Sequence, residues 1–186
     1  MAAVKRKPIG LILVLLLLFV APFVAAWLLN ASGWRPIGTR NYGELITPPE
    51  NLSAARFVLA DGQVLKWRDP SWTWTIFALA GPDCAASCVA RIDELRRVRL
   101  TLNQNADRAR VVVVGASLDA ATLAALTPVQ TATDADAKLA NLRPSAPDQV
   151  AVAFVDPNGS LVLRYPVGYD GTPLRKDLAR LIKEGF

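Results

Sequence analysis

The distribution of apolar and polar positions divides the chain into an apolar N-terminal segment and a longer segment of mixed periodicity. No charged residue occurs from Pro8 to Leu29. As a helix rising 1.5 Å per residue, the roughly 20 apolar residues from Ile9 onward are long enough to cross a hydrocarbon core about 30 Å thick. We therefore predict a transmembrane helix over residues 9–29, after a basic tail over residues 1–8. A cleaved signal peptide, with Ala25-Ala26 near the cleavage site, is the alternative, although its apolar region would be shorter, roughly 7–15 residues.

The remainder of the chain reads as a linker followed by one domain. Residues 30–52 are rich in proline and glycine and show little periodicity, so we predict a linker there and a folded domain over 53–186. Residues 56–59 and 63–67 flank an Asp-Gly turn and predict a hairpin. The predicted strands that follow are 72–79, 110–115, 149–155 and 161–165; the predicted helices are 85–102, 120–126, 135–142 and 174–183.

The order of these elements predicts the fold class. A run of four valines, Val111–Val114, is typical of a strand that is buried on both faces at the centre of a helix-covered sheet. A β-α-β unit, then a β-hairpin and a final helix, is the thioredoxin arrangement. We therefore predict an α/β, thioredoxin-like fold, with a central mixed sheet flanked by helices, preceded by one transmembrane helix.

The charge distribution predicts the orientation in the membrane and excludes one class of partner. The net charge is +5, but three basic residues, Lys5, Arg6 and Lys7, precede the span and only Arg35 and Arg40 follow closely after it. This asymmetry predicts a cytoplasmic N-terminus and a single-pass protein of a bacterial inner membrane, with its domain in the periplasm. The part beyond the span carries 18 basic and 16 acidic residues, which is not the basic excess of a nucleic-acid-binding protein.

The chemistry of the chain is concentrated in its two cysteines, Cys84 and Cys88. The chain has no histidine, so Ser-His-Asp and Cys-His pairs and histidine-based zinc sites are excluded. No glycine-rich phosphate-binding loop is present either. A paired-cysteine turn between a strand and a helix is where thioredoxin-like folds keep their reactive thiols.

The spacing of the cysteines suits a disulfide at the start of a helix. Cysteines four apart in a helix have Cα atoms about 6 Å apart, within the range that a disulfide spans. We predict Asp83 as the N-cap, which places Cys84 at the first turn, where unpaired N–H groups and the helix dipole favour the reactive thiolate. The negative charge of Asp83 acts in the opposite direction.

Three interpretations of the pair remain open on these residues. The first is thiol–disulfide exchange, in which Cys84 attacks and Cys88 resolves. The second is an inert structural disulfide, although so small a loop gives little chain-entropy stabilisation. The third is a copper(I) site formed by the two thiolates, since soft ligands select that ion.

The chain resembles the Sco/SenC family of membrane-tethered, thioredoxin-like proteins of cytochrome c oxidase assembly. The resemblance covers roughly residues 40–183 and rests on the anchor, the Cys-x-x-x-Cys spacing and the turn Asp156-Pro157-Asn158-Gly159 after a late strand. It implies a cysteine-containing partner, either a copper-site subunit of the oxidase or another assembly factor. The family also has an Asp-His pair before the late strand, and its histidine is the third copper ligand. In this chain the matching positions are Asp148 and Gln149.

Thioredoxin-like folds usually place a cis-proline before the strand that faces the cysteines, and the resemblance implies Pro147 for this role, with Pro144 as the alternative. The residues predict a membrane-tethered thiol–disulfide exchange protein without a resident cofactor, and the Sco/SenC resemblance implies that it assists oxidase assembly. A non-catalytic assembly protein that kept the fold, and a copper(I) carrier using the cysteines alone, are the alternatives. If the chain is an enzyme, it is a thiol–disulfide oxidoreductase.

Overall fold

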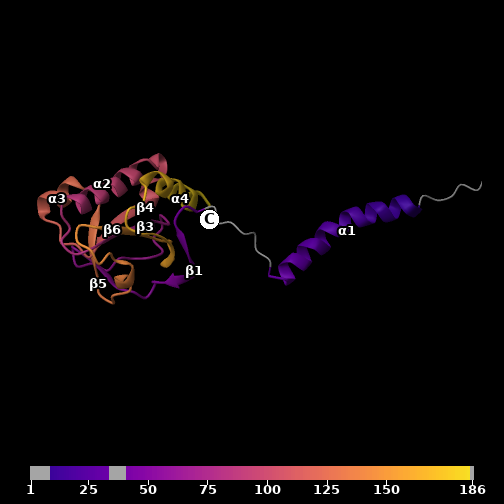
Figure 1. The fold of residues 1–186 in the computed structure, drawn as a ribbon, viewed down its shortest axis with the longest axis horizontal. Helices are drawn as coiled ribbons and strands as arrows, with labels where there is room; N and C mark the ends of the chain where they lie inside the picture. The colour runs from indigo at the N-terminus through magenta and orange to yellow at the C-terminus, as the bar shows by residue number, and fades with distance from the viewer. Residues whose placement is uncertain (1–8, 34–40, 185–186) are drawn as a thin grey trace, which may run out of the picture. The chain divides into compact units, whose positions relative to one another are not determined.

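A computed structural model of the chain describes residues 9–33 and 41–184, in two compact units that divide between Thr39 and Arg40 (Figure 1). The first unit contains helix α1 (Ile9–Ala31), with Pro22 inside it. From Ile12 to Ala31 this helix is long and apolar enough to cross a membrane. The predicted basic tail over 1–8, and Arg35 and Arg40, lie outside the described residues.

The second unit is built on one mixed seven-stranded sheet. Its central strand β3 (Trp74–Ala80) runs parallel to β4 (Ala109–Val114) on one side and antiparallel to β6 (Val150–Val155) on the other. Across the sheet, the strands are β1 (Glu44–Asn51), β7 (Ser160–Tyr165), β6 (Val150–Val155), β3 (Trp74–Ala80), β4 (Ala109–Val114), β5 (Gln130–Asp134) and β2 (Phe57–Leu59).

The three middle strands form the core because almost all of their side chains are apolar and buried. Every residue of β3 and β6 is buried, and so are the four valines Val111–Val114 of β4. A strand that is apolar at every position needs cover on both faces of its sheet. The sequence interpretation of the valine run as a central strand is thus confirmed.

Helices cover one face of the sheet and irregular chain covers the other. Figure 1 shows α2 (Ala86–Leu100), α3 (Ala120–Ala125) and α4 (Gly171–Glu184) along the same side. Apolar residues of α2 and α4, Ile92 and Leu178 among them, pack with the sheet in one cluster. The opposite cluster is closed by residues such as Leu52, Phe57 and Leu139. Two 3₁₀ helices, η1 (Asn103–Arg108) and η2 (Ala140–Leu142), lie in the connections.

Two of the predicted elements need correction at the start of the domain. The predicted linker over 30–52 contains strand β1, which pairs with β7, and Leu52 is fully buried, so the folded domain begins earlier than residue 53. The prolines of this segment were interpreted as the mark of a linker. Proline is, however, tolerated on an edge strand such as β1. The predicted hairpin of residues 56–67 is reduced to one bridge, Val58 to Val64.

The connection between β4 and β6 also differs from the prediction. Strand β5 was not predicted; it pairs with β4 and supplies the partner of β2. The predicted helix over 135–142 is replaced by turns and the short η2. An Asp134 carboxylate oxygen accepts a hydrogen bond from the Leu139 N–H at 2.7 Å, which stabilises a turn in place of a helix. The strands β6 and β7, their Asp156–Gly159 turn and the last helix are as predicted.

Candidate functional site: a cysteine pair at a helix start

The two cysteines form a disulfide in the short connection between the central strand and the first helix of the domain. Strand β3 ends at Ala80 and α2 begins at Ala86, and the Cα atoms of Cys84 and Cys88 are 5.1 Å apart. Cys88 is fully buried in the cluster under α2, whereas Cys84 is only partly buried. An incoming sulfur can therefore reach Cys84 more readily than Cys88.

The start of α2 is capped by a residue that the sequence interpretation did not assign to this role. The predicted N-cap, Asp83, is wrong: the N-cap position is Ala85, which has no capping group. Asp83 is exposed and adopts a left-handed backbone conformation, with φ of 52°. Asp83 therefore lies two residues before the N-cap position and does not cap the helix.

The capping group is the carboxylate of Asp148, about sixty residues further along the chain. Its two oxygens accept hydrogen bonds from the backbone N–H groups of Ala85 at 2.9 Å, Ser87 at 3.1 Å and Cys88 at 2.7 Å. These bonds lower the pKa of Asp148 below its ordinary value of 3.8, because they stabilise the ionised carboxylate. The bond from Cys88 has the largest effect. A carboxylate that is ionised at neutral pH therefore lies at the first turn of α2.

Two further backbone hydrogen bonds hold the loop of Asp148 against the cysteine loop. The Gly81 N–H donates to the carbonyl of Gln149 at 2.9 Å, and the Asp148 N–H donates to the carbonyl of Pro82 at 3.0 Å. A side chain at Gly81 would collide with the carbonyl oxygen of Ala146, so only glycine allows the loops to approach this closely. The structure therefore brings Asp148 and Gln149, far away in sequence, beside the cysteines.

The expected cis-proline is not found at this loop. Among the described residues the cis peptide bonds precede Pro48 and Pro128, so the predictions of a cis bond at Pro147 or Pro144 are wrong. Pro147 is exposed in the segment that leads into β6. The residue after it, Asp148, instead accepts hydrogen bonds from the backbone of the cysteine loop, that of Cys88 included.

Arg143 also holds the backbone beside the cysteine loop, and no pattern in the sequence predicted this role. Its guanidinium donates from Nε to the carbonyl of Ala80 at 2.9 Å and from Nη2 to the carbonyl of Gly115 at 3.1 Å. It thereby joins the ends of β3 and β4, directly before the cysteine loop. No motif surrounds this arginine, so only the folded structure identifies its partners.

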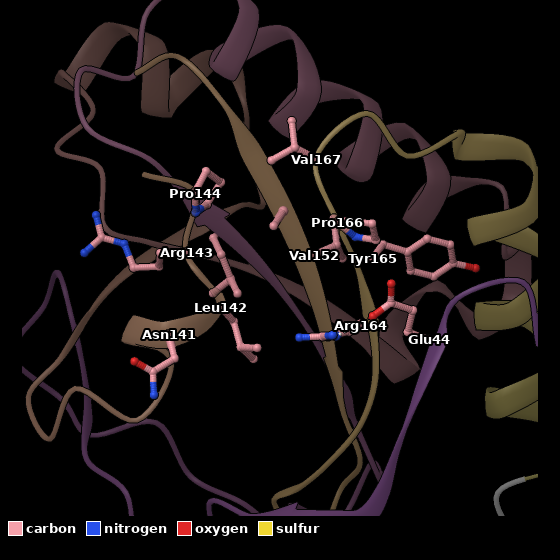
Figure 2. Close-up of a pocket in the computed structure, with 12 residues that line it drawn as sticks. Glu44, Asn141, Leu142, Arg143, Pro144, Val152, Arg164, Tyr165, Pro166 and Val167 are labelled. Atoms are coloured by element: carbon pink, nitrogen blue, oxygen red, sulfur yellow. Dashed lines mark hydrogen bonds and ion pairs between the residues drawn. The ribbon is translucent and has the colours of Figure 1, made fainter. Parts of the chain in front are cut away.

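The cavity drawn in Figure 2 is lined in part by Arg143 but not by either cysteine. It has a volume of about 220 Å³ and lies between the loop that carries Arg143 and Pro144 and the strand end that carries Arg164 and Tyr165. Arg164 is paired with Glu44 at 2.6 Å. With both arginines engaged by the protein itself, this cavity offers no reactive group.

A second depression borders the cysteine loop. It has a volume of about 530 Å³ and is lined chiefly by apolar side chains of α2 and α3. Ala86, which lies between the two cysteines in sequence, forms part of its wall. The segment between the two cysteines therefore contributes to the wall of a concave and largely apolar surface.

The donor atoms at this site do not fit the three-ligand copper centre that the family resemblance implies. Two sulfurs are present, the chain has no histidine, and Gln149 occupies the position expected for the imidazole. In the described part of the chain, no three histidine, cysteine or acidic residues are grouped so that they could hold a metal ion. An amide and a hydrogen-bonded carboxylate are poor ligands for soft copper(I).

Comparison with known proteins identifies the fold of the domain. The family described as "Transmembrane-like, thioredoxin-like, C-terminal domain" matches residues 74–184. A search of curated proteins finds no match in sequence.

Similar solved structures include ScoI of Arabidopsis thaliana with copper bound, at 12% identity and a TM-score of 0.52, covering 76% of this chain and 98% of that one. Another is a peroxiredoxin Q of Xanthomonas campestris, at 13% identity and a TM-score of 0.50, covering 80% of this chain and 100% of that one.

These findings confirm the predicted fold class. Strand β3, helix α2 and strand β4, followed by the β6–β7 hairpin and α4, form a thioredoxin-like domain with one candidate membrane helix before it. The family model and the shared fold thus agree with the predicted thioredoxin-like domain, which follows an apolar helix long enough to span a membrane. At 12–13% identity the likeness to these structures extends to the fold alone.

Proposed function

Because the chain belongs to the transmembrane-like, thioredoxin-like family, we propose that it is a membrane-tethered protein that exchanges thiols and disulfides with a partner protein. The observation that carries this proposal is the asymmetry of the Cys84–Cys88 pair, in which one sulfur is accessible and the other is buried directly behind it. An accessible attacking thiol with a protected resolving thiol is the arrangement that stepwise exchange requires.

The exchange proceeds in two balanced steps. In the reduced protein the Cys84 thiolate attacks a disulfide of the partner, which forms a mixed disulfide and releases one partner thiolate. The Cys88 thiolate then attacks the Cys84 sulfur, which forms the Cys84–Cys88 bond and releases the second partner thiolate. The partner gains two electrons and the cysteine pair loses two, and the same steps run in reverse when the partner is oxidised.

The proposal extends to a location and a partner, which the sequence supports. The basic N-terminus and the single apolar helix support a bacterial inner-membrane protein with a cytoplasmic N-terminus and a periplasmic domain. By the Sco/SenC resemblance, the partner is a cysteine-bearing, copper-site subunit of cytochrome c oxidase or another factor in its assembly. The cysteines of the partner, rather than a metal on this chain, are the substrate.

Trapping the mixed disulfide tests this function. A Cys88→Ser variant keeps the attacking thiol but lacks the resolving one, so we expect a covalent complex that non-reducing electrophoresis detects and a reductant dissolves. The matched control is Cys84→Ser, in which only the buried thiol remains, and it should trap far less. If neither variant traps a protein, exchange with a partner protein is wrong, even where the wild-type pair cycles with a dithiol reductant.

A non-catalytic assembly role is the second candidate, and the carboxylate of Asp148 at the first turn of α2 favours it, because that charge opposes thiolate formation at Cys84. The double variant Cys84→Ser, Cys88→Ser discriminates between the two. Full oxidase assembly with this variant supports the non-catalytic role, and loss of assembly with the variant still folded supports exchange.

A further inference from the structure

We propose that Asp148 is a positioning residue that sets the redox potential of the Cys84–Cys88 pair, by occupying the backbone N–H groups that would otherwise stabilise a Cys84 thiolate. This inference rests on the proposed function, in which the pair cycles between a disulfide and two thiols. It concerns a residue outside the Cys-x-x-x-Cys segment, which the structure alone brings to the site.

The first argument is the use of the hydrogen-bond donors at the start of α2. A thiolate at a helix N-terminus is stabilised by unpaired N–H groups of the first turn. Here the N–H groups of Ala85, Ser87 and Cys88 all donate to the Asp148 carboxylate. A thiolate on Cys84 must therefore compete with a carboxylate that already holds these donors.

The second argument is charge. Asp148 forms no ion pair among the described residues, and its neighbour across the loop, Asp83, is also acidic. The basic residues nearest in sequence bind other groups: Arg91 of α2 pairs with Glu94 at 2.8 Å, and Arg143, five residues before Asp148, donates to backbone carbonyls. A thiolate on Cys84 would form beside a negative charge that no described cation neutralises.

The occupied N–H donors and the negative charge both destabilise the reduced form. Neither affects the disulfide, which carries no charge. Reduction adds two electrons and up to two protons, and the carboxylate disfavours the thiolate states of the product. The pair of the wild-type protein is therefore more reducing than the same cysteines would be without this carboxylate. Removing the charge while keeping an acceptor, as in Asp148→Asn, should shift the equilibrium towards the dithiol.

The test is the redox equilibrium of the full-length chain in detergent micelles, in buffers of reduced and oxidised dithiothreitol at pH 7. The reductant becomes its cyclic disulfide as it donates two electrons to the protein. We expect Asp148→Asn to raise the equilibrium constant for reduction about tenfold, which corresponds to about 30 mV. In the reduced protein, iodoacetamide should also alkylate Cys84 several-fold faster, because more thiolate is present.

The chain offers a matched control in Asp119, which caps α3. Its carboxylate accepts hydrogen bonds from the Thr122 N–H and hydroxyl, both at 2.8 Å, so Asp119→Asn removes a similar capping charge from another helix. In this variant the equilibrium constant for reduction should stay within twofold of the wild-type value. Asp148→Ser, a neutral residue that also caps helices, should shift the potential in the same direction as Asp148→Asn and serves if the latter fails to fold.

The outcomes separate this inference from the proposed function. If the wild-type pair cycles but both Asp148 variants keep its potential, or if Asp119→Asn shifts it equally, the role of Asp148 is wrong and exchange stands. If the potential shifts as expected but no partner is trapped by Cys88→Ser, the role of Asp148 stands and the exchange function fails. If dithiothreitol reduces the cysteine pair in neither the wild type nor any variant, both the role of Asp148 and the exchange function are wrong.

Discussion

At the scale of single residues, the chemistry of this domain depends on which carboxylate meets the first turn of α2. Sequence proximity favours Asp83, but the folded chain uses Asp148. The carboxylates of Asp119 and Asp148 each accept backbone N–H groups at the start of a helix, and these bonds lower the pKa of each. Both therefore contribute stability as well as local geometry.

This contribution predicts a specific dependence of stability on pH. Because the pKa of Asp148 is below 3.8 in the folded state, its ionised form stabilises the fold above that pH, and the contribution is lost as pH falls through the folded-state value. We expect Asp148→Asn to be less stable than wild type at pH 7, with the difference narrowing below pH 3.8. Urea unfolding at pH 7, 4, 3 and 2 measures the difference.

The control for this prediction is Asp107→Asn, whose side chain is 98% exposed. It should follow the wild-type pH profile closely. A difference between Asp148→Asn and wild type that stays constant from pH 7 to pH 2 would contradict the prediction.

At the scale of elements, a buried acid fixes the first strand of the domain to its last helix. Asp177 of α4 is fully buried and accepts hydrogen bonds from the N–H groups of Tyr42 at 2.7 Å and Gly43 at 3.0 Å and from the Tyr165 hydroxyl at 2.7 Å. These bonds hold the chain at the entrance to β1, an edge strand that pairs only with β7. Asp177 thus decides where the folded domain begins.

We expect Asp177→Ala to lower the free energy of unfolding by about 3 kcal/mol, because three donors, one buried and two partly buried, lose their acceptor. The loss should be accompanied by faster hydrogen exchange in β1 than in β3, since β1 is the strand that Asp177 anchors. Tyr165→Phe, which removes one of the three donors, should cost only about 1 kcal/mol. Denaturant titration and exchange mass spectrometry measure these effects, and a cost below about 0.5 kcal/mol for Asp177→Ala would refute the anchoring role.

At the scale of the whole molecule, the domain is held together by two apolar clusters and not by its disulfide. One cluster lies under α2 and α4 and the other on the opposite face of the sheet. The disulfide closes a loop of only a few residues, because its cysteines are four apart in sequence. Redox cycling can therefore proceed on a folded scaffold.

Reduction should consequently leave the fold intact. A loop this short restricts the unfolded chain little, so we expect reduction to lower the free energy of unfolding by about 2 kcal/mol or less. Circular dichroism and urea unfolding with and without dithiothreitol measure this, and the double variant Cys84→Ser, Cys88→Ser should not respond to the reductant. Loss of the native spectrum on reduction would show that the disulfide is structural.

The apolar helix predicts that the full chain stays with the membranes when cells are fractionated. We expect the full chain to stay in the membrane pellet after washing with alkaline carbonate, because α1 is long enough to span the bilayer. A chain of residues 40–186 should remain in the supernatant. A soluble product whose measured mass begins after Ala25-Ala26 would instead indicate a cleaved signal peptide.

The sequence was sufficient for features that depend on local composition. Periodicity and β-branched runs predicted β3, α2, β4, β6 and β7, since burial on both faces requires uninterrupted apolar residues. The spacing of Cys84 and Cys88 predicted a disulfide-capable pair at a helix start, because helical geometry sets their separation. Strands β1 and β5 were missed because their composition is that of loops and long-range pairing decides their structure. The helix over 135–142 was predicted from local composition and is wrong, because the turn there is set by the fold.

The sequence by itself determined the thioredoxin-like order of elements, the apolar anchor segment and the position of the cysteines, because each depends on residues close together in the chain. Only the tertiary structure decided that Cys88 is buried and Cys84 accessible, that Asp148 rather than Asp83 caps α2, and that Arg143 joins the ends of β3 and β4. The physical reason is that backbone N–H and carbonyl groups carry no sequence signal for their distant partners. Those partners are fixed only when the sheet brings the loop before β6 against the loop after β3.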